Sequence, residues 1–561
     1  MRGSSSAPPL YAIAITADGS AGAVVRADGE DTTTVVSGPL ETLVAEVARI
    51  EVAAAVRWVW WHRRAVAPLV AADVRLSRCW DVQEVHRLVV GGWSAEPDEV
   101  WAAAHALDPQ ARPSGPTGDL FDLTRPDEPV VRDDGFLSAR CLEPSWPSGL
   151  QDCEQWAELA LVVARRQQDL IRARSARAVS TAHSESGAAV LCAELEQHGL
   201  PLDRATMEQL ITLAAGPRPE SEAHAAALRR ERDEHVLRHV PGRERTDLRN
   251  PAQVLQLLHA IGVRVDDTRS WRLEPYRAMH PVVEALLTWR KSERIATTYG
   301  WSWLDRFVGP DDRLRGEWTV CDGGAGRMTA GAGLHSLPAP LRPGVAAHDG
   351  HVLVRADLGQ VEPRVLATVS GDRAFAAATV ADDLYADVAA RLRIERPVAK
   401  IAVLAAMYGQ TSGAAGEALK GLHAAYPTAM AFLQRAADQG ERGEAVMTWG
   451  GRLIPVSEGG DAGRRRAVGR FTRNAVIQGA AAELFKAWAL TVRAAISGLG
   501  GEIVLCLHDE LVLHVPEQYA DEAVAAVHRT LASATHHWSG GAPVRFVADV
   551  SVVQRWSEAK D

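Results

Sequence analysis

The stretch LCLHDELVLHVP holds three adjacent ionisable residues, His508, Asp509 and Glu510, between apolar runs at residues 503–507 and 511–515. Runs of Val, Leu and Ile on both sides predict two β-strands joined by a tight turn, so the polar residues would lie at the tip of a hairpin. Asp is common in turns, and an ordinary polar turn is therefore one interpretation. A catalytic role is the other interpretation, and it needs a second carboxylate elsewhere in the chain.

A second carboxylate ends the apolar stretch HVLVRAD, where Asp357 closes a predicted strand and Glu362 and Arg364 follow. An aspartate in this place is also a common helix N-cap. Two aspartates at strand ends, Asp357 and Asp509, would suit a pair of divalent ions that stabilise the attacking and leaving oxygens of a phosphoryl transfer. Mg²⁺ takes only one or two protein carboxylates when phosphates complete its coordination. The pair predicts a site for two Mg²⁺ ions, with Mn²⁺ as the alternative.

The segment RPVAKIAVLAAMYGQTSG, between the two aspartates, predicts a helix with a basic stripe. Arg396, Lys400, Leu404 and Tyr408 recur every four residues, and Gly409 follows the last of them. Such a stripe can be an ordinary solvated face. Beside two metal-binding aspartates, contact with a nucleotide explains it better, because the cations suit a triphosphate and the apolar end suits a base.

A further predicted helix, GRFTRNAVIQGAAAELFK, repeats the four-residue spacing with Arg470, Asn474 and Gln478. An arginine and two amides on one face suit hydrogen bonds to nucleic acid. The Gly-rich stretch GGAGRMTAGAGLHSLP places Arg327 in a loop whose backbone could approach a nucleic-acid strand closely. It is not a Walker loop, because no G-K-[ST] follows.

The composition is that of a soluble globular protein. Of 561 residues, 47% are hydrophobic and 24% charged, and the six cysteines include no C-x-x-C, so neither a zinc site nor a disulfide framework is indicated. No signal peptide or membrane-spanning run is evident, which favours a cytoplasmic, nucleoid-associated protein. The net charge of −10 argues only weakly against nucleic-acid binding, because a local groove can be basic in an acidic protein.

Taken together, the motifs resemble those of family A DNA polymerases, the polymerase I family, and especially the compact actinobacterial type. DLGQVEPRVLA is similar to the family's motif A, RPVAKIAVLAAMYG to motif B (the O helix) and LCLHDELVLHV to motif C. GRMTAGAGLHSLP resembles the loop on the primer–template duplex, and the Arg470 helix resembles the R-x-x-x-N-x-x-x-Q helix near the template. The similarity runs from about residue 185 to the end.

The resemblance implies a monomeric DNA-directed DNA polymerase that extends a primer 3′ end with deoxynucleoside triphosphates in repair or replication, without membrane contact. Asp357 and Asp509 would be the metal ligands. The implied catalytic residues are Asp357, Asp509, Glu510, Lys400 and His508. The implied nucleotide-binding residues are Arg396, Lys400, Leu404, Tyr408, Glu362, Gln360 and Tyr385, among which Glu362 would exclude the ribose 2′-hydroxyl. The implied DNA-binding residues are Arg327, Arg470, Asn474, Gln478 and Gly409.

Several positions depart from the family pattern. Leu404 stands where the O helix usually has Phe or Tyr, Leu358 and Gly359 stand where motif A reads Tyr-Ser, and Tyr385 stands where many members have His. These changes leave both aspartates in place but bear on nucleotide stacking and sugar discrimination.

The implied fold is multidomain, α/β and α+β: a right-hand polymerase of palm, fingers and thumb, preceded by a small ribonuclease H-like exonuclease-type domain. We expect a degenerate 3′–5′ exonuclease-like domain with a Pro/Gly-rich linker over residues 1–150. A helical connector and thumb, extended and solvated, would occupy 151–305. The palm would comprise 306–365 and 491–561, and the fingers 366–490. No 5′-nuclease domain is expected.

The first domain lacks the carboxylates that a proofreading exonuclease needs. The strand YAIAITADGSAG offers Asp18 but no glutamate, no acid lies between Arg57 and Val70, and no tyrosine lies between Tyr11 and Tyr276. Asp81 resembles a strand aspartate of that fold that binds no metal. We therefore expect no proofreading, because too few carboxylates remain to hold two Mg²⁺ ions.

Two alternatives stay open. A single-subunit RNA polymerase would share the two aspartates and the Lys400–Tyr408 spacing, although Glu362 and the Arg470 helix favour DNA. A catalytically inactive DNA-binding scaffold could keep the same fold, although it would not need to retain both aspartates.

Overall fold

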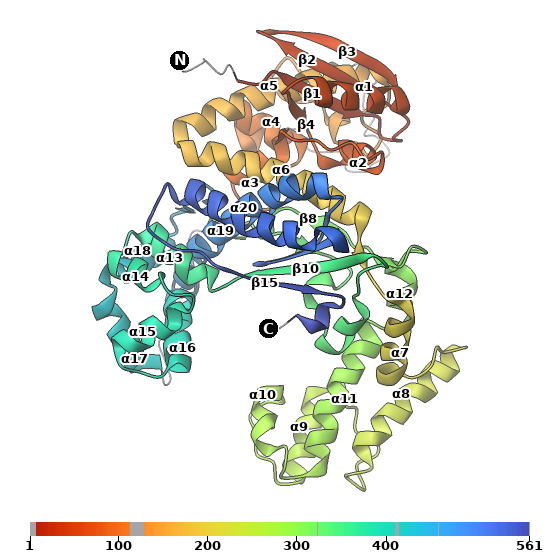
Figure 1. Ribbon diagram of the computed structural model, residues 1–561, viewed down its shortest axis with the longest axis vertical. Helices are drawn as coiled ribbons and strands as arrows, with labels where there is room; N and C mark the ends of the chain where they lie inside the picture. Colours follow the sequence, from red (N-terminus) through yellow and green to blue (C-terminus); the bar gives the residue numbers. More distant parts are fainter. Residues whose placement is uncertain (1–6, 113–127, 323, 410–414, 458, 560–561) are drawn as a thin grey trace. The chain divides into compact units, whose positions relative to one another are not determined.

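The computed structural model of the chain describes residues 7–112, 128–322, 324–409, 415–457 and 459–559. Contacts divide it into two compact units, each built from several segments of the chain (Figure 1). The first unit comprises residues 1–198, 318–329 and 354–552. The second comprises residues 199–317, 330–353 and 553–561.

The first unit opens with a five-stranded mixed sheet in the order β3-β2-β1-β4-β5. Its strands are β1 (Leu10–Ile15), β2 (Ala21–Asp28), β3 (Asp31–Pro39), β4 (Arg57–Trp60) and β5 (Cys79–Asp81). β1 pairs antiparallel with β2 and parallel with β4. Alternate residues of a strand face opposite sides of its sheet, so Ala12 and Ala14 enter one hydrophobic core and Ile13 another. The start of the chain therefore forms a mixed sheet, and the bounds of the expected N-terminal domain stay a prediction.

Helices cover both faces of this sheet. They are α1 (Leu40–Ala53), α2 (Ala67–Ala71), α3 (Val82–Val89), α4 (Pro97–His105), α5 (Leu150–Arg174) and α6 (Ala176–His198). Trp156 and Leu161 of α5 belong to the core on one face, and Val190 of α6 belongs to the core on the other. These two helices therefore complete the N-terminal cores, and the expectation that residues from 151 onward form an extended, solvated domain is wrong for them.

A charged residue of α6 is buried with its partners. Glu185 is fully buried, and Lys486 Nζ lies 2.6 Å and Arg452 Nη2 2.7 Å from its Oε2. Burial of a carboxylate is tolerated when cations pair with it. Both partners come from far along the chain, so the sequence of α6 alone does not show that Glu185 is buried.

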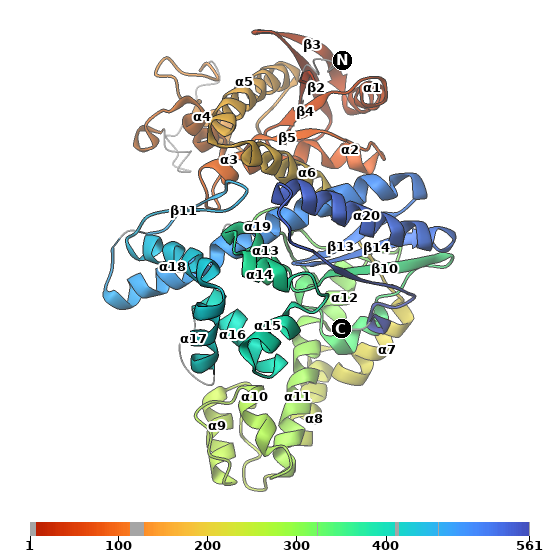
Figure 2. The same ribbon diagram turned by 60° about the vertical axis from the view of Figure 1, so that its left-hand side comes forward.

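A second sheet of four strands has the order β13-β14-β10-β15. Its strands are β10 (His351–Leu358), β13 (Glu502–Leu507), β14 (Glu510–Pro516) and β15 (Ala548–Val553), and α19 (Ala462–Ile496) and α20 (Ala520–Ser539) pack against it (Figure 2). β13 and β14 form the predicted antiparallel hairpin, in which Leu507 pairs with Glu510 across a two-residue turn. Glu510 is therefore the first residue of β14 and not part of the tip.

Between β10 and α19, the described residues form six helices and a short hairpin. They are α13 (Val361–Ser370), α14 (Arg373–Ala378), α15 (Leu384–Leu392), α16 (Arg396–Tyr408), α17 (Ala415–Ala425) and α18 (Pro427–Glu441), with β11 (Val446–Met447) and β12 (Leu453–Ile454). α16 is the predicted basic-stripe helix. Pro397 suits its first turn, and Gly409, at φ +68°, ends it in the left-handed conformation.

The second unit is mostly helical. Its elements are α7 (Arg204–Ala215), α8 (Glu222–Leu237), α9 (Pro251–Ala260), α10 (Ser270–Leu273), α11 (Pro281–Thr298) and α12 (Trp301–Phe307), with β6 (Leu200–Pro201) and β7 (Arg313–Leu314). Val236, Leu258 and Leu286, from α8, α9 and α11, share one core. Across both units, no helix within the described ranges is long and apolar enough to cross a membrane.

Candidate active site

The two predicted metal-binding aspartates lie on neighbouring strands. Asp357 is near the end of β10, and Asp509 lies in the turn that precedes β14, the strand next to β10. The Leu358 amide donates a hydrogen bond of 2.8 Å to the Asp509 carbonyl, which fixes the turn against the end of β10. Burial, and then the negative charge of Asp357, raise the pKa of Asp509 to about 7. The two carboxylates therefore repel each other, and a divalent cation would relieve that repulsion.

An arginine that the sequence analysis overlooked completes this cluster. Arg355 Nη2 lies 3.1 Å from Asp357 Oδ2 and 3.1 Å from Glu510 Oε2. Its side chain is 8% exposed, against 31% for Asp357. Arg355 and Asp357 are two residues apart on β10 and so share a face of the sheet. From the sequence alone, a single arginine in an apolar strand could equally be exposed to solvent. Its role becomes visible only when the neighbouring strand is known.

The donor set fits Mg²⁺. Within the described part of the chain, no group of three or more His, Cys, Asp or Glu side chains could hold a metal ion by itself. Asp357 and Asp509 do offer hard carboxylate oxygens, close enough for the charge of Asp357 to raise the pKa of Asp509. Mg²⁺ accepts so few protein ligands where substrate phosphates complete its coordination. The pair could therefore bind the ions together with a phosphate-bearing substrate.

Glu362 and Arg327 form an ion pair in the same unit. Arg327 Nη2 donates to Glu362 Oε1 over 3.0 Å. Burial raises the pKa of Glu362, and the guanidinium opposes that shift. Burial, and then the positive charge of Arg327, lower the pKa of His508. The predicted DNA contact, Arg327, therefore interacts both with the predicted sugar-selecting residue, Glu362, and with the predicted primer-end residue, His508.

His508 occupies the first position of the hairpin turn with a φ of +40°. Positive φ is unusual for a residue with a side chain, but two-residue hairpin turns require it at this position. The His508 imidazole and the Asp509 carboxylate are thus held by a short turn between two strands.

The predicted nucleotide-binding stripe lies along one face of α16. Arg396 and Lys400 are exposed, Leu404 is half-buried and Tyr408 is 39% exposed. The stripe lies on α16, whereas the two aspartates lie at β10 and at the turn before β14, so the candidate site is assembled from different elements.

Asp383, a residue that the sequence analysis did not single out, links α16 to the end of β10. It accepts hydrogen bonds from Arg396 Nε at 2.5 Å and from Gln360 Nε2 at 3.2 Å. It also caps the N-terminus of α15, as the amides of Tyr385 and Ala386 donate to it. Asp383 therefore positions Arg396, the first residue of α16, relative to the segment that follows Asp357.

Tyr385 is buried, at 5% exposure, and lies next to Arg396, the cation that is hydrogen-bonded to Asp383. The Arg396 guanidinium lies 6.0 Å from the centre of its ring. Burial, and then the negative charge of Glu362, raise the pKa of Tyr385 to about 12. The phenol therefore stays neutral and contributes an aromatic support for Arg396.

Arg364 clamps the segment after β10. Its buried guanidinium donates to the carbonyls of Gly359, Thr379, Ala381, Asp382 and Arg545. Burial lowers its pKa to about 10, so it remains charged at neutral pH. A Cβ at Gly359 would lie 3.0 Å from a methyl group of Val547, so a larger residue there would require Val547 to shift.

The end of α16 packs against α19. Arg473 Nε donates to the Ala406 carbonyl over 2.6 Å, and a Cβ on Gly409 would lie 3.0 Å from Arg470 Cγ. On the same helix, Arg470 is exposed while Asn474 and Gln478 are half-buried. The structure therefore brings the predicted nucleotide-binding helix and the predicted DNA-binding helix together.

A family model for DNA polymerase family A matches residues 262–558, more than half of the 561-residue chain. The chain belongs to DNA polymerase family A. Polymerases of this family use divalent metal ions, which agrees with the carboxylate pair.

Curated relatives of this family A chain include three polymerases. The thermostable DNA polymerase I of Thermus filiformis is 29% identical over 327 residues, which cover 52% of this chain and 38% of that protein. DNA polymerase I of Chloroflexus aurantiacus is 27% identical over 292 residues, 46% and 31% of the two chains. DNA polymerase theta of Caenorhabditis elegans is 24% identical over 284 residues, 47% and 18% of the two chains. The chain thus matches well under half the length of each relative.

A solved structure extends the likeness to nearly the whole fold. The POL domain of Pol1 from M. smegmatis, in complex with a DNA primer-template and dNTP, has a TM-score of 0.69 and 18% identity to this chain. The match covers 98% of this chain and 96% of that one. The family A fold of palm, fingers and thumb predicted from the motifs is confirmed.

The N-terminal sheet of this family A chain places its acids in structural roles. Asp18 is exposed, and hydrogen bonds from Thr16 and then Ser20 lower its pKa to about 2. Asp81 is buried as the N-cap of α3 and accepts from Trp60 Nε1 over 2.7 Å. Burial lowers the pKa of His62, which follows β4, to about 4, and the neighbouring arginines add to the effect. The absence of proofreading stays a prediction.

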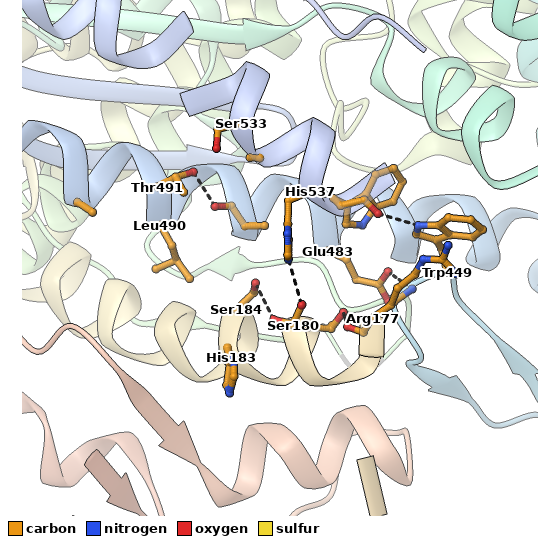
Figure 3. Close-up of a pocket in the computed structure, with 16 residues that line it drawn as sticks. Arg177, Ser180, His183, Ser184, Trp449, Glu483, Leu490, Thr491, Ser533 and His537 are labelled. Carbon is orange, nitrogen blue, oxygen red and sulfur yellow. Dashed lines mark hydrogen bonds between the residues drawn. The ribbon is translucent and has the colours of Figure 1, made fainter. Parts of the chain in front are cut away.

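A separate cavity of about 470 Å³ lies among α6, α19 and α20 (Figure 3). His537 points toward Ser180 across it, with a hydrogen bond of 3.2 Å, and Arg177 stacks over the Trp449 ring at 3.7 Å. None of the predicted catalytic, nucleotide-binding or DNA-binding residues lines the cavity. It is not part of the candidate active site.

Proposed function

We propose that this chain is a template-directed DNA polymerase that extends a primer 3′ end with deoxynucleoside triphosphates. The observation that carries the proposal is the adjacency of Asp357, near the end of β10, and Asp509, in the turn before the neighbouring strand, where the charge of Asp357 helps to raise the pKa of Asp509. Membership of family A supports it, and so does the likeness to a Pol1 domain solved with primer-template and dNTP.

Asp357 and Asp509 would hold two Mg²⁺ ions, with Mn²⁺ as a substitute. When bound, such ions stabilise the charge on the attacking and leaving oxygens of the transfer. The residues of the chain position the carboxylates that hold these ions. The short turn keeps Asp509 against β10, and Glu510, paired with Arg355, supports the site from the first residue of β14.

The exposed cations of α16 would bind the triphosphate. Lys400 presents an ammonium group, and Arg396, held by Asp383, presents a guanidinium. Tyr408 and Leu404 would contact the base. Gln360 and Tyr385 would act through this assembly, because Gln360 bonds to Asp383 and Tyr385 supports Arg396.

The remaining residues would handle the sugar and the DNA. Glu362 would crowd the ribose 2′ position, and His508 would meet the primer end. Arg327, Arg470, Asn474, Gln478 and Gly409 would line the path of the duplex and the template.

Primer extension by the purified chain tests the proposal. With Mg²⁺ and the four deoxynucleotides, a labelled primer annealed to a longer template should lengthen to the template end, and EDTA should abolish the reaction. No extension with either Mg²⁺ or Mn²⁺ would indicate the inactive scaffold. Equal extension with ribonucleotides would indicate the RNA polymerase alternative.

A further inference from the structure

Arg355 is a buried cation inside the proposed metal site. Its Nη2 is 3.1 Å from Asp357 on its own strand and 3.1 Å from Glu510 on the neighbouring strand, so one guanidinium joins β10 to β14. The Arg355 and Glu510 side chains are 8% and 11% exposed. A buried arginine stays charged and needs partners for its N–H groups, and here two carboxylates supply them.

This cation has two opposite effects on a divalent ion. Before an ion binds, the guanidinium fixes two of the three clustered carboxylates and offsets part of their repulsion. Once an ion approaches, the same positive charge repels it, because like charges a few ångströms apart interact strongly in a partly buried site. Arg355 should therefore raise the stability of the metal-free protein and lower its intrinsic affinity for metal.

We propose that Arg355 is a positioning residue that holds Asp357 and Glu510 ready in the metal-free protein and weakens divalent-ion binding until substrate phosphates contribute ligands. The proposal rests on the proposed function in placing the ions at Asp357 and Asp509. Its physical prediction concerns metal binding in the absence of DNA and nucleotide, and so can be tested whether or not the chain extends primers.

The test measures Mn²⁺ binding to the full chain by electron paramagnetic resonance, and thermal melting in EDTA and in saturating Mn²⁺. Arg355→Gln should bind Mn²⁺ about tenfold more tightly than the wild type, the size of effect expected for one unit charge about 6 Å from a divalent ion in a water-like dielectric. Its melting temperature should fall in EDTA and recover in Mn²⁺.

Two further variants separate charge from structure. Arg355→Lys keeps the charge but loses the planar fork, so it should bind Mn²⁺ as the wild type does while melting lower in EDTA. Arg493→Gln removes a comparably buried partner of Glu194, whose ion pair joins α19 to α6, and it should lower the melting temperature equally in EDTA and Mn²⁺ without changing affinity.

Unchanged or weaker Mn²⁺ binding in Arg355→Gln would overturn the proposal, as would tightening in Arg355→Lys. If Arg355→Gln fails to fold, Arg355→Lys still tests the proposal. The lysine variant must bind Mn²⁺ with wild-type affinity, and its melting temperature must be lower than that of the wild type in EDTA. Absence of primer extension in the wild type would count against the proposed function alone, since Mn²⁺ binding is measured without DNA.

Discussion

Arg327 and Glu362 are joined by a 3.0 Å hydrogen-bonded ion pair, so a residue proposed to contact DNA holds the residue proposed to select the sugar. The pair lies within one compact unit and unites the Gly-rich loop with the first turn of α13. Glu362 is otherwise largely enclosed, which raises its pKa. The effect of the size of the Glu362 side chain on sugar selection can be separated from the effect of its charge by comparing substitutions that remove both with substitutions that remove the charge alone.

Glu362→Ala should increase ribonucleotide insertion relative to deoxynucleotide insertion by about tenfold or more, since removing a crowding group from a pocket has effects of this size. Glu362→Gln keeps the bulk and should change the ratio far less. Single-nucleotide kcat/KM values for matched deoxy- and ribonucleotides measure this. Equal loss of discrimination in both variants would show that charge, held by Arg327, does the selecting.

Asp357→Ala and Asp509→Ala should each reduce primer extension by about a thousandfold or more, because the bound ions carry the stabilisation of the transferring phosphoryl group. Duplex affinity, measured by fluorescence anisotropy, should change little. Asp549→Ala, an exposed position on β15 of the same sheet, is the matched control and should retain activity. Robust extension by either catalytic-site variant would contradict the assignment.

Lys400→Ala should lower kcat/KM for nucleotide incorporation by about 10–100-fold, from the ~1.5–3 kcal/mol of a hydrogen bond to a charged group. Lys420, exposed on the neighbouring helix α17 and paired with Glu417, provides the control, and Lys420→Ala should be neutral. Steady-state kinetics over a range of dNTP concentrations separates the two. If Lys400→Ala and Lys420→Ala had the same kcat/KM, the assignment of α16 to the nucleotide-binding site would be wrong.

The stability of the metal-free protein should depend on pH through Asp509. Its folded-state pKa, about 7, exceeds the ordinary 3.8, so protonation favours the folded state. That contribution is fully present below pH 3.8 and is lost as the pH rises through about 7. In EDTA, Asp509→Asn should therefore melt increasingly above the wild type as the pH rises toward neutrality, and Mg²⁺ should narrow the gap. A gap that is constant with pH would contradict this.

The N-terminal domain should not remove 3′ nucleotides. Asp18 and Asp81, two of its acids, serve as a turn residue and a helix cap. A mismatched primer incubated with the protein and Mg²⁺ or Mn²⁺, without nucleotides, should remain intact over hours. Degradation that persists in Asp357→Ala would show an exonuclease in this domain, whereas degradation lost in that variant would point to reversal of the polymerase reaction.

Elements whose periodicity is local were predictable from the sequence. The hairpin around Asp509, the strand before Asp357 and the helix from Arg396 to Tyr408 all follow from runs of residues that are contiguous in the chain. The structure confirms each of them, within a residue or two at the ends.

What escaped prediction depends on partners distant in sequence. Arg355 belongs to the carboxylate cluster only because β14 lies beside β10, and Glu510 is 155 residues away. Asp383 accepts hydrogen bonds from both Gln360 and Arg396, and the sequence pattern does not predict that these three side chains point toward one another. The burial of Glu185 in α6 could not be predicted either, because its cations come from residues 452 and 486.

Arg364 also ties the chain between β10 and α15 to the end of the strand. The carbonyls of Thr379, Ala381 and Asp382 are fixed to the same guanidinium as that of Gly359, which directly follows β10. Asp383, the next residue along, accepts hydrogen bonds from Gln360 and Arg396. Loss of the Arg364 guanidinium would therefore release the segment that carries Asp383, and with it the residue that holds the cation at the start of α16.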